Sequence, residues 1–227
     1  MKRISTCGGV LVSVLTCSGL VAAEPNVQGL TLGVERVFGL TSVTATDEND
    51  AVTNTSSETG FSLGNAGTAR ALYTIPRVHV DYVLPMGLSF GGALGFRAVS
   101  YTYEADPAVG PTLSTDSGGT AFLFAPRVGY LLGFNDQFGI WPRLGFSYVN
   151  VSSSGDDDTD DDDTSLGYGA FTLEAPFVFT PHKAFGFVAT PSLDLGVAGS
   201  REVGNNEYDG DLSLTEFGIT LGLFVAF

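Results

Sequence analysis

The last eleven residues of the chain, FGITLGLFVAF from Phe217 to Phe227, constrain its fold more than any other segment. All six odd-numbered positions are apolar, whereas glycine, threonine and alanine fill most of the even-numbered ones. Side chains that alternate with a period of two lie on opposite faces of a β-strand. In a soluble sheet, a terminal strand with one wholly apolar face would be an exposed edge strand prone to aggregation. In a closed barrel, lipid covers that face and closure pairs both edges, so the pattern predicts a membrane-spanning β-barrel.

Turn signals along the rest of the chain predict eight strands in a single all-β domain. The expected strands cover residues 28–44, 69–83, 88–103, 120–132, 140–151, 167–179, 185–199 and 212–227. The connections between them alternate between long and short, as in transmembrane antiparallel up-and-down barrels with long outer loops and tight periplasmic turns. A soluble sandwich or lipocalin-type barrel is the alternative. It is disfavoured because most strands carry an apolar face and also a polar face that holds ionised groups.

The first residues predict a cleavable leader. A basic start at Lys2 and Arg3 precedes a short stretch of small and apolar residues, and Ala23 ends a small-residue cleavage pattern. The stretch is too short, and too rich in serine, threonine and glycine, for a spanning helix. We therefore predict a signal peptide over residues 1–23 and a barrel domain over residues 24–227, with both termini periplasmic.

Both cysteines of the chain, Cys7 and Cys17, lie within this leader. Lipidation of Cys17 is the alternative to cleavage after Ala23, but Cys17 follows a threonine, whereas lipidated cysteines normally follow glycine, alanine or serine. The predicted mature chain has no cysteine, so disulfides and thiol chemistry are excluded.

The chain is strongly acidic, with 10 lysines and arginines against 25 aspartates and glutamates, a formal net charge of −15. Loss of Lys2 and Arg3 with the leader would make it −17. Nucleic acid is excluded as a natural partner, because phosphate requires a basic surface. Seven aspartates gather in one predicted outer loop: Asp156, Asp157, Asp158, Asp160, Asp161, Asp162 and Asp163.

This aspartate loop offers oxygen ligands that could chelate Ca²⁺. It lacks the glycine and the fixed spacing of a dedicated calcium loop, so a solvated acidic loop is the favoured interpretation. We expect no metal and no cofactor.

Charged residues within the predicted strands fall on the face opposite the apolar one, which is the lumen side. The predicted lumen network consists of Glu35, Arg77, His79, Asp81, Arg97, Arg127, Arg143, Glu174, Asp194 and Glu216. The arginines lie on the second to fifth strands and the acids mainly on the other four, with Asp81 as the outlier. We therefore expect a basic wall paired with an acidic wall across a narrow lumen. The alternative is charges wetted separately in a water-filled lumen.

Arg36 and the strand prolines do not fit regular strands. Arg36 shares its parity with Leu32 and Val34, so an unbroken strand would aim it at lipid, at a cost of about 2–4 kcal/mol. We predict a bulge at Glu35–Arg36 that turns Arg36 inward or lets it reach an interface. Pro76, Pro126, Pro176 and Pro191 fall within expected strands, where each removes a ladder donor. The recurring Pro-Arg-Val or Pro-Arg-Leu triplets that begin at Pro76, Pro126 and Pro142 suggest further bulges.

The terminal pattern Thr220-x-Gly222-x-x-Val225-x-Phe227 resembles the C-terminal signal of barrels inserted by the outer-membrane assembly machinery. The mature chain as a whole resembles the small eight-stranded outer-membrane β-barrel superfamily, of the outer membrane protein A transmembrane-domain type. This resemblance implies residence in the outer membrane of a Gram-negative bacterium, with the assembly machinery, membrane lipids and lipopolysaccharide as partners. The loops carry no subfamily signature, so the resemblance implies location and fold rather than activity.

A search for catalytic residues is mostly negative, because the chain has only two histidines. His79 is expected in the lumen and His182 in a periplasmic turn, whereas barrel enzymes that modify lipid A need a His/Ser-type site near the outer leaflet. We predict a non-enzymatic, monomeric barrel with a closed lumen that acts structurally or in surface interactions through its acidic loops. The alternative is a narrow pore or carrier for ions or small hydrophobic molecules. The narrow lumen of eight strands favours closure.

Overall fold

The computed structural model describes residues 27–48, 53–63, 73, 75–105, 113–154, 164–203, 206–208 and 211–227. The predicted leader and the aspartate loop lie outside these ranges. The strands are β1 (Gly29–Glu48), β2 (Thr53–Leu63), β3 (Arg77–Val83), β4 (Leu88–Ala105), β5 (Leu113–Tyr130), β6 (Leu132–Gly133), β7 (Phe138–Ile140), β8 (Arg143–Ser154), β9 (Thr164–Glu174), β10 (Phe177–His182), β11 (Phe185–Val203), β12 (Asn206–Tyr208) and β13 (Asp211–Ala226).

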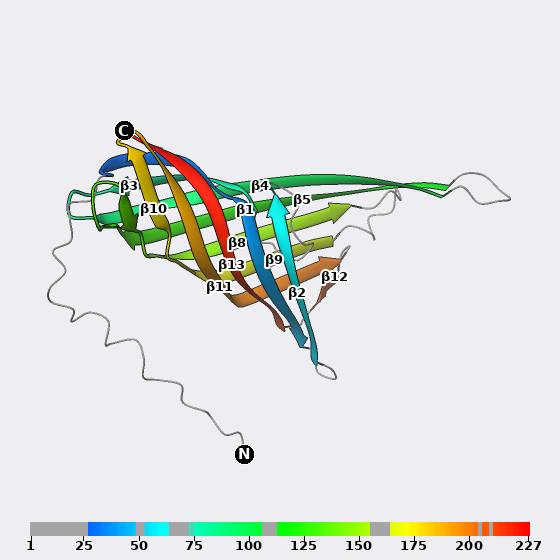
Figure 1. The fold of residues 1–227 in the computed structure, drawn as a ribbon. Helices are drawn as coiled ribbons and strands as arrows, with labels where there is room; N and C mark the ends of the chain where they lie inside the picture. Colours follow the sequence, from blue (N-terminus) through cyan, green and yellow to red (C-terminus); the bar gives the residue numbers. More distant parts are fainter. Residues whose placement is uncertain are drawn as a thin grey trace, which may run out of the picture.

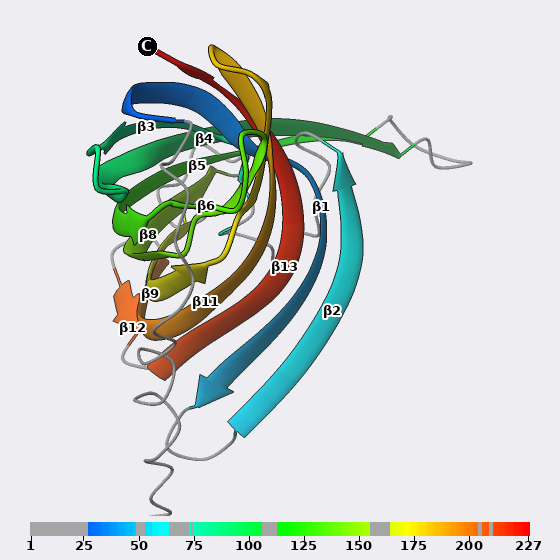
Figure 2. The same ribbon diagram turned by 60° about the vertical axis from the view of Figure 1, so that its left-hand side comes forward.

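Eight strands form a closed antiparallel barrel in the order β13-β1-β3-β4-β5-β8-β9-β11, and β11 pairs with β13 to close it (Figures 1 and 2). The short strands β6, β7 and β10 extend the wall at one end. The pairing of Thr31 with Ala226 puts the start of β1 and the end of β13 at the same end of the barrel. The predicted eight-stranded barrel is therefore confirmed. Among the residues of described placement, no helix is long and apolar enough to cross a membrane.

Strict alternation explains why these segments form the wall. In β3, Arg77, His79 and Asp81 are buried in the lumen, whereas Val78 and Val80 are exposed on the outside. The same alternation places a band of large apolar side chains on the outer face, including Phe90, Leu94, Phe122, Phe124, Leu144, Phe171, Leu173, Phe187, Phe217 and Leu221. The inside-outside assignment made from parity is confirmed for these strands.

The segment after β1 differs from the prediction. The expected polar loop is largely β2, which pairs with β1 between Phe38 and Glu48. In the described part of the expected strand over residues 69–83, the strand is β3, which pairs with β1 between Gly29 and Glu35. The sequence of β2, TNTSSETGFSL, is polar on both faces. An alternation of apolar and polar residues therefore could not mark it as a strand.

The prolines do not create bulges, so that interpretation is wrong. Pro126 and Pro191 lie within strands whose register is the same on both sides of the proline. Pro142 and Pro176 lie between strands, and the strands before and after each of them keep the same register with their neighbours. Pro76 lies just before β3. Three proline carbonyls still accept a ladder hydrogen bond: Tyr130 N–H to Pro142 O at 2.9 Å, Trp141 N–H to Pro176 O at 2.8 Å and Ala175 N–H to Pro191 O at 3.0 Å. Each proline thus removes one donor without shifting the pairing.

Candidate functional site

Three layers of side chains fill the barrel lumen. The order of the layers can be followed along β5, from the end of the barrel with the long hairpins to the end with the short turns. Inward-facing side chains mark the three layers in turn: Leu123, Arg127 and, just beyond the end of the strand, Leu131. The upper apolar layer contains Val43, Tyr73, Ile75, Ala93, Ala121, Leu123, Ala125, Val149, Ala170 and Leu214. The lower apolar layer contains Val27, Val83, Leu131, Trp141, Val178, Val188 and Phe224.

The charged layer lies between these two apolar layers and is the candidate functional site. It consists of Glu35, Arg36, Arg77, His79, Asp81, Arg127, Arg143, Glu174, Asp194 and Glu216. Each of these residues is at most 6% exposed. Charges buried this deeply are stable only when they are paired and hydrogen-bonded, so their partners decide whether the lumen is a rigid filling or a wet channel.

Arg127 is the centre of the charged layer. Its Nε lies 3.0 Å from Asp81 Oδ1 and its Nη2 lies 2.5 Å from Asp81 Oδ2, so the guanidinium grips this carboxylate with two hydrogen bonds. On its other side, Nη1 lies 2.6 Å from Glu35 Oε2, and Glu174 Oε2 is more distant at 3.4 Å. The planar fork of arginine suits this bridging between carboxylates of different strands.

Glycines on the neighbouring strands make room for these arginines. Gly91 on β4 stands in register between Asp81 on β3 and Arg127 on β5. A Cβ atom at Gly91 would lie 2.2 Å from the Val80 carbonyl oxygen and 2.5 Å from Asp81 Oδ1. Arg127 therefore reaches Asp81 across a strand position that only glycine can fill without a clash.

Arg143 and Arg77 join the two acids at the centre of the layer. Arg143 Nη1 lies 2.8 Å from Glu35 Oε1, and its Nε lies 3.1 Å from Glu174 Oε2. The Arg143 guanidinium also stands 5.1 Å from the ring centroid of Trp141, which links the charged layer to the lower apolar layer. Arg77 forms an ion pair with Glu174, and its Nε lies 3.6 Å from Glu35 Oε2.

Arg36 enters the lumen through a bulge in β1. Val34 pairs with Leu223 and Phe38 with Leu221, so residues 35–37 stand opposite the single residue Gly222. Arg36 has a φ of 57°, a left-handed conformation that is uncommon for a residue other than glycine. The bulge predicted at Glu35–Arg36 is therefore confirmed, and it turns Arg36 inward rather than toward an interface, with 1% exposure.

Once inside, Arg36 bridges acids from two further strands. Its Nη1 lies 3.0 Å from Asp194 Oδ2 and its Nη2 lies 3.0 Å from Glu174 Oε1. Thr172 Oγ1 also donates to Asp194 Oδ1 at 2.6 Å. Arg36 is the cation that the sequence reasoning left out of the network, although its anomalous parity was the signal that could have included it.

Tyr73 closes the top of the charged layer from outside the wall strands. Its backbone N–H donates to Glu216 Oε2 at 3.2 Å, and its carbonyl oxygen accepts a hydrogen bond from Arg36 Nη1. The Tyr73 side chain is fully buried in the upper apolar layer. Tyr73, which was expected in a wall strand, is thus in the lumen, and Pro76, which precedes β3, was the available signal that the strand does not continue past it.

The expected division into a basic and an acidic wall holds only in part. Arginines of β3, β5 and β8 do reach Glu35 on β1 and Glu174 on β9. However, Arg36 adds a cation to the acidic side. Arg97 is half-buried and pairs in register with Ala121, six residues above Arg127 on β5. Within the described part of the chain it forms no ion pair.

The charged layer contains one histidine, His79. His79 Nδ1 lies 2.8 Å from Asp81 Oδ2, which orients the ring within the charged layer. Among the described residues, no group of three or more His, Cys, Asp or Glu side chains could hold a metal ion. A cavity of about 10 Å³ beside Arg77, Arg127 and Arg143 has room for about one water molecule.

The residues of the predicted assembly signal all lie at the seam of the barrel. Thr220 is buried and Phe227 is 75% exposed, with its backbone N–H donating to Leu30 O at 2.9 Å. Val225 pairs with Leu32 on one side and with Phe185 on the other. Gly222 faces the β1 bulge, where a Cβ atom would lie 2.5 Å from the Val34 carbonyl oxygen. Recognition of this pattern by the assembly machinery stays a prediction.

A closed eight-stranded antiparallel barrel with an apolar outer band and a charged lumen is a β-barrel of the outer-membrane type. No family model and no curated protein matches the chain. Similar solved structures include Ail of Yersinia pestis (12% identity, 87% of this chain, 99% of that chain, TM-score 0.38). They also include Neisserial surface protein A (13%, 88%, 98%, 0.44) and the outer-membrane protease OmpT of Escherichia coli (6%, 90%, 99%, 0.45).

Proposed function

We propose that the protein is an integral outer-membrane barrel with a closed lumen, and that it serves a structural or surface-interaction role rather than an enzymatic one. The observation that carries this proposal is the filling of the lumen at three successive levels. Leu123 and Arg127 on β5 and Leu131 just beyond its end mark these levels, and none of them is more than 6% exposed. A lumen packed in this way has no room for a partner, so a partner would bind at the ends of the barrel.

The proposed location follows from the outer face of the barrel. Its large apolar side chains would contact lipid hydrocarbon, and aromatic residues such as Phe138, Phe179 and Phe185 gather toward the end with the short turns. In this proposal the short turns are periplasmic and the long hairpins extracellular. Membrane lipids, lipopolysaccharide and the assembly machinery are the proposed partners, and the protein is proposed to be monomeric.

The proposed surface role is carried by the long hairpins. The β4–β5 hairpin projects well beyond the other wall strands (Figure 1), and β1 extends with β2 on the same end. The acidic connection between β8 and β9, residues 155–163, would be displayed beside them. Because this connection is dense in carboxylates, the proposed partner surface is cationic or bridged by cations.

Protease treatment of intact cells tests this orientation. A protease added outside should cut within residues 106–112 and 155–163, while the short turn at residues 84–87 should be cut only after the outer membrane is permeabilised. Mass spectrometry of the fragments identifies each cut. Cleavage of the short turn in intact cells, or recovery of the protein as a soluble periplasmic species, would contradict the proposal.

A narrow pore or carrier for ions or small hydrophobic molecules is the second candidate, and Tyr73 is the observation in its favour. Tyr73 fills the upper layer from a segment outside the wall strands and is held there by Glu216 and Arg36 through its own backbone. A filling held by hydrogen bonds can leave the lumen more easily than a wall strand can. Planar-bilayer conductance of the wild-type protein separates a closed barrel from a pore for ions.

A further inference from the structure

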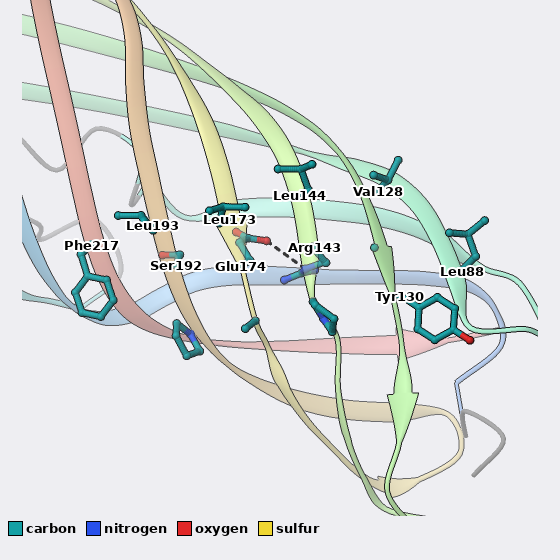
Figure 3. Close-up of a pocket in the computed structure, with 14 residues that line it drawn as sticks. Leu88, Val128, Tyr130, Arg143, Leu144, Leu173, Glu174, Ser192, Leu193 and Phe217 are labelled. Carbon is teal, nitrogen blue, oxygen red and sulfur yellow. Dashed lines mark ion pairs between the residues drawn. The ribbon is translucent and has the colours of Figure 1, made fainter. Parts of the chain in front are cut away.

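A shallow groove crosses the outer side of the barrel wall over β8, β9 and β11 (Figure 3). Its volume is about 610 Å³, which is in the range of small-molecule sites. Leu144, Leu173 and Leu193 stand along it on three neighbouring strands. The Arg143–Glu174 ion pair of the charged layer lies between two of these strands, so the groove sits at the level of the charged layer.

Short outward side chains create this groove. The pairing of Glu174 with Arg143 and with Ser192 places Pro142, Ala175 and Pro191 side by side, one position nearer the short turns. Arg143, Glu174 and Ser192 point into the lumen, so these three neighbours face outward. Two proline rings and one methyl group between taller leucines leave a depression in the wall.

A second groove, of about 460 Å³, continues the first toward the short turns. It is lined by Phe138, Phe177, Phe179, Phe187 and Ala189, among others. Ala189 and Phe177 lie two residues beyond Pro191 and Ala175 on the same outward face of the wall, so the two grooves follow each other along the barrel. Both are almost wholly apolar, which favours an aliphatic occupant.

Lys183, in the turn between β10 and β11, stands at the end of this path. It is exposed, and it is the only lysine of the chain outside the predicted leader. Eight residues separate it from Ala175, which at roughly 3.3 Å per residue is about 26 Å along the strand. With a strand tilt of about 35–45°, this is about 20 Å across the membrane, close to the depth of one leaflet with its headgroup region.

We propose that this wall binds a phospholipid of the leaflet that faces the short turns. An acyl chain lies in the two grooves, and the anionic phosphate meets Lys183. Charge complementarity supports this occupant, because Lys183 is an exposed cation at the end of the two apolar grooves. The inference rests on the proposed insertion of the barrel in the outer membrane.

Native mass spectrometry of the purified protein in micelles doped with dipalmitoyl phosphatidylglycerol tests the site. The wild-type protein should retain one phospholipid. Lys183→Gln should weaken retention about fivefold, as expected for loss of one cation near an anionic headgroup. Ala175→Phe should weaken it at least about tenfold by filling the groove. The matched controls Lys183→Arg and Leu94→Phe, the latter on the outer face of β4, should stay within about twofold of wild type.

Retention by both test variants equal to that of wild type would overturn the phospholipid site. A two-chain mass that Ala175→Phe abolishes would also overturn it, because the groove would then be an interface between copies. Outer-membrane fractionation of the wild type keeps the two proposals apart. If the wild type does not reach the membrane, the proposed function fails, whereas normal insertion with unselective lipid retention contradicts only the lipid site.

Discussion

Arg127 holds carboxylates from two strands, Asp81 on β3 and Glu35 on β1, within 2.6 Å of its guanidinium nitrogens. Removing it would leave both charges buried without their closest partner, a change that typically costs about 3–5 kcal/mol. We therefore expect Arg127→Ala to lower the unfolding free energy by that amount. Adding Asp81→Asn should recover part of the loss. Glu174 is farther away at 3.4 Å, and its replacement should give a weaker recovery.

Urea unfolding of the folded barrel, followed by the fluorescence of the single tryptophan, Trp141, measures these changes. Arg97→Ala is the matched control, because Arg97 is half-buried and lies above the charged layer. It should change the unfolding free energy by less than about 0.5 kcal/mol. Equal losses for Arg127→Ala and Arg97→Ala would show that the ion pairs of the layer do not determine stability.

Gly91 supports the same contact from the neighbouring strand. A Cβ atom there would lie 2.2 Å from the Val80 carbonyl oxygen, and backbone cannot move aside as a side-chain end can. We expect Gly91→Ala to cost about 1–3 kcal/mol of unfolding free energy, the usual range for overpacking. Gly92→Ala is the control, since its nearest atom would be 3.1 Å away. A larger loss at Gly92 than at Gly91 would count against this account.

At the scale of the strand, the β1 bulge combines a backbone requirement with a side-chain requirement. Arg36 has a positive φ and also pairs with Asp194 and Glu174. Arg36→Gly removes the side chain but suits the left-handed backbone, whereas Arg36→Ala removes the side chain and keeps the strain. We expect both variants to be destabilised, and Arg36→Ala by about 1 kcal/mol more than Arg36→Gly. Chemical unfolding measures the difference, and a less stable glycine variant would contradict the bulge geometry.

The last strand should matter more for insertion than its final contacts suggest. Phe227 is 75% exposed on the outer face, so its deletion removes at most about 2–3 kcal/mol of apolar contact. If it also serves as the terminal residue of the assembly signal, deletion should sharply lower the amount of barrel in the outer membrane. Phe227→Tyr, which keeps an aromatic ring, should insert normally. Immunoblots of fractionated membranes measure both, and undiminished insertion of the truncated chain would refute the signal.

The lipid-facing strands could be predicted because each has one apolar and one polar face, as β3 and β13 do. The strand β2 could not, because serine and threonine occupy both of its faces and give no alternation. The odd or even position along the strand also correctly placed both Arg127 and Arg97 on the lumen face. It could not show that they lie at different heights, because height depends on the register between strands.

For the whole molecule, the sequence could not show which charged residues would pair within the lumen. These pairs depend on how the strands are placed relative to one another. The β1 bulge moves Arg36 into the network, and Tyr73 reaches the lumen from a segment outside the wall strands. Neither position follows from the composition or period of its own segment. The class of fold, by contrast, needed only the outer apolar faces and the short turns, both of which are local features.

The central claim is that the lumen is closed by an apolar, a charged and a second apolar layer. Conductance of the purified wild-type protein in planar lipid bilayers tests it most directly, with Tyr73→Gly measured in parallel to ask whether the upper filling alone blocks passage. The layered lumen predicts no stable channel for the wild type, because the upper apolar layer, the charged layer and the lower apolar layer fill three successive levels. Reproducible unit conductance steps from the wild-type protein would contradict it.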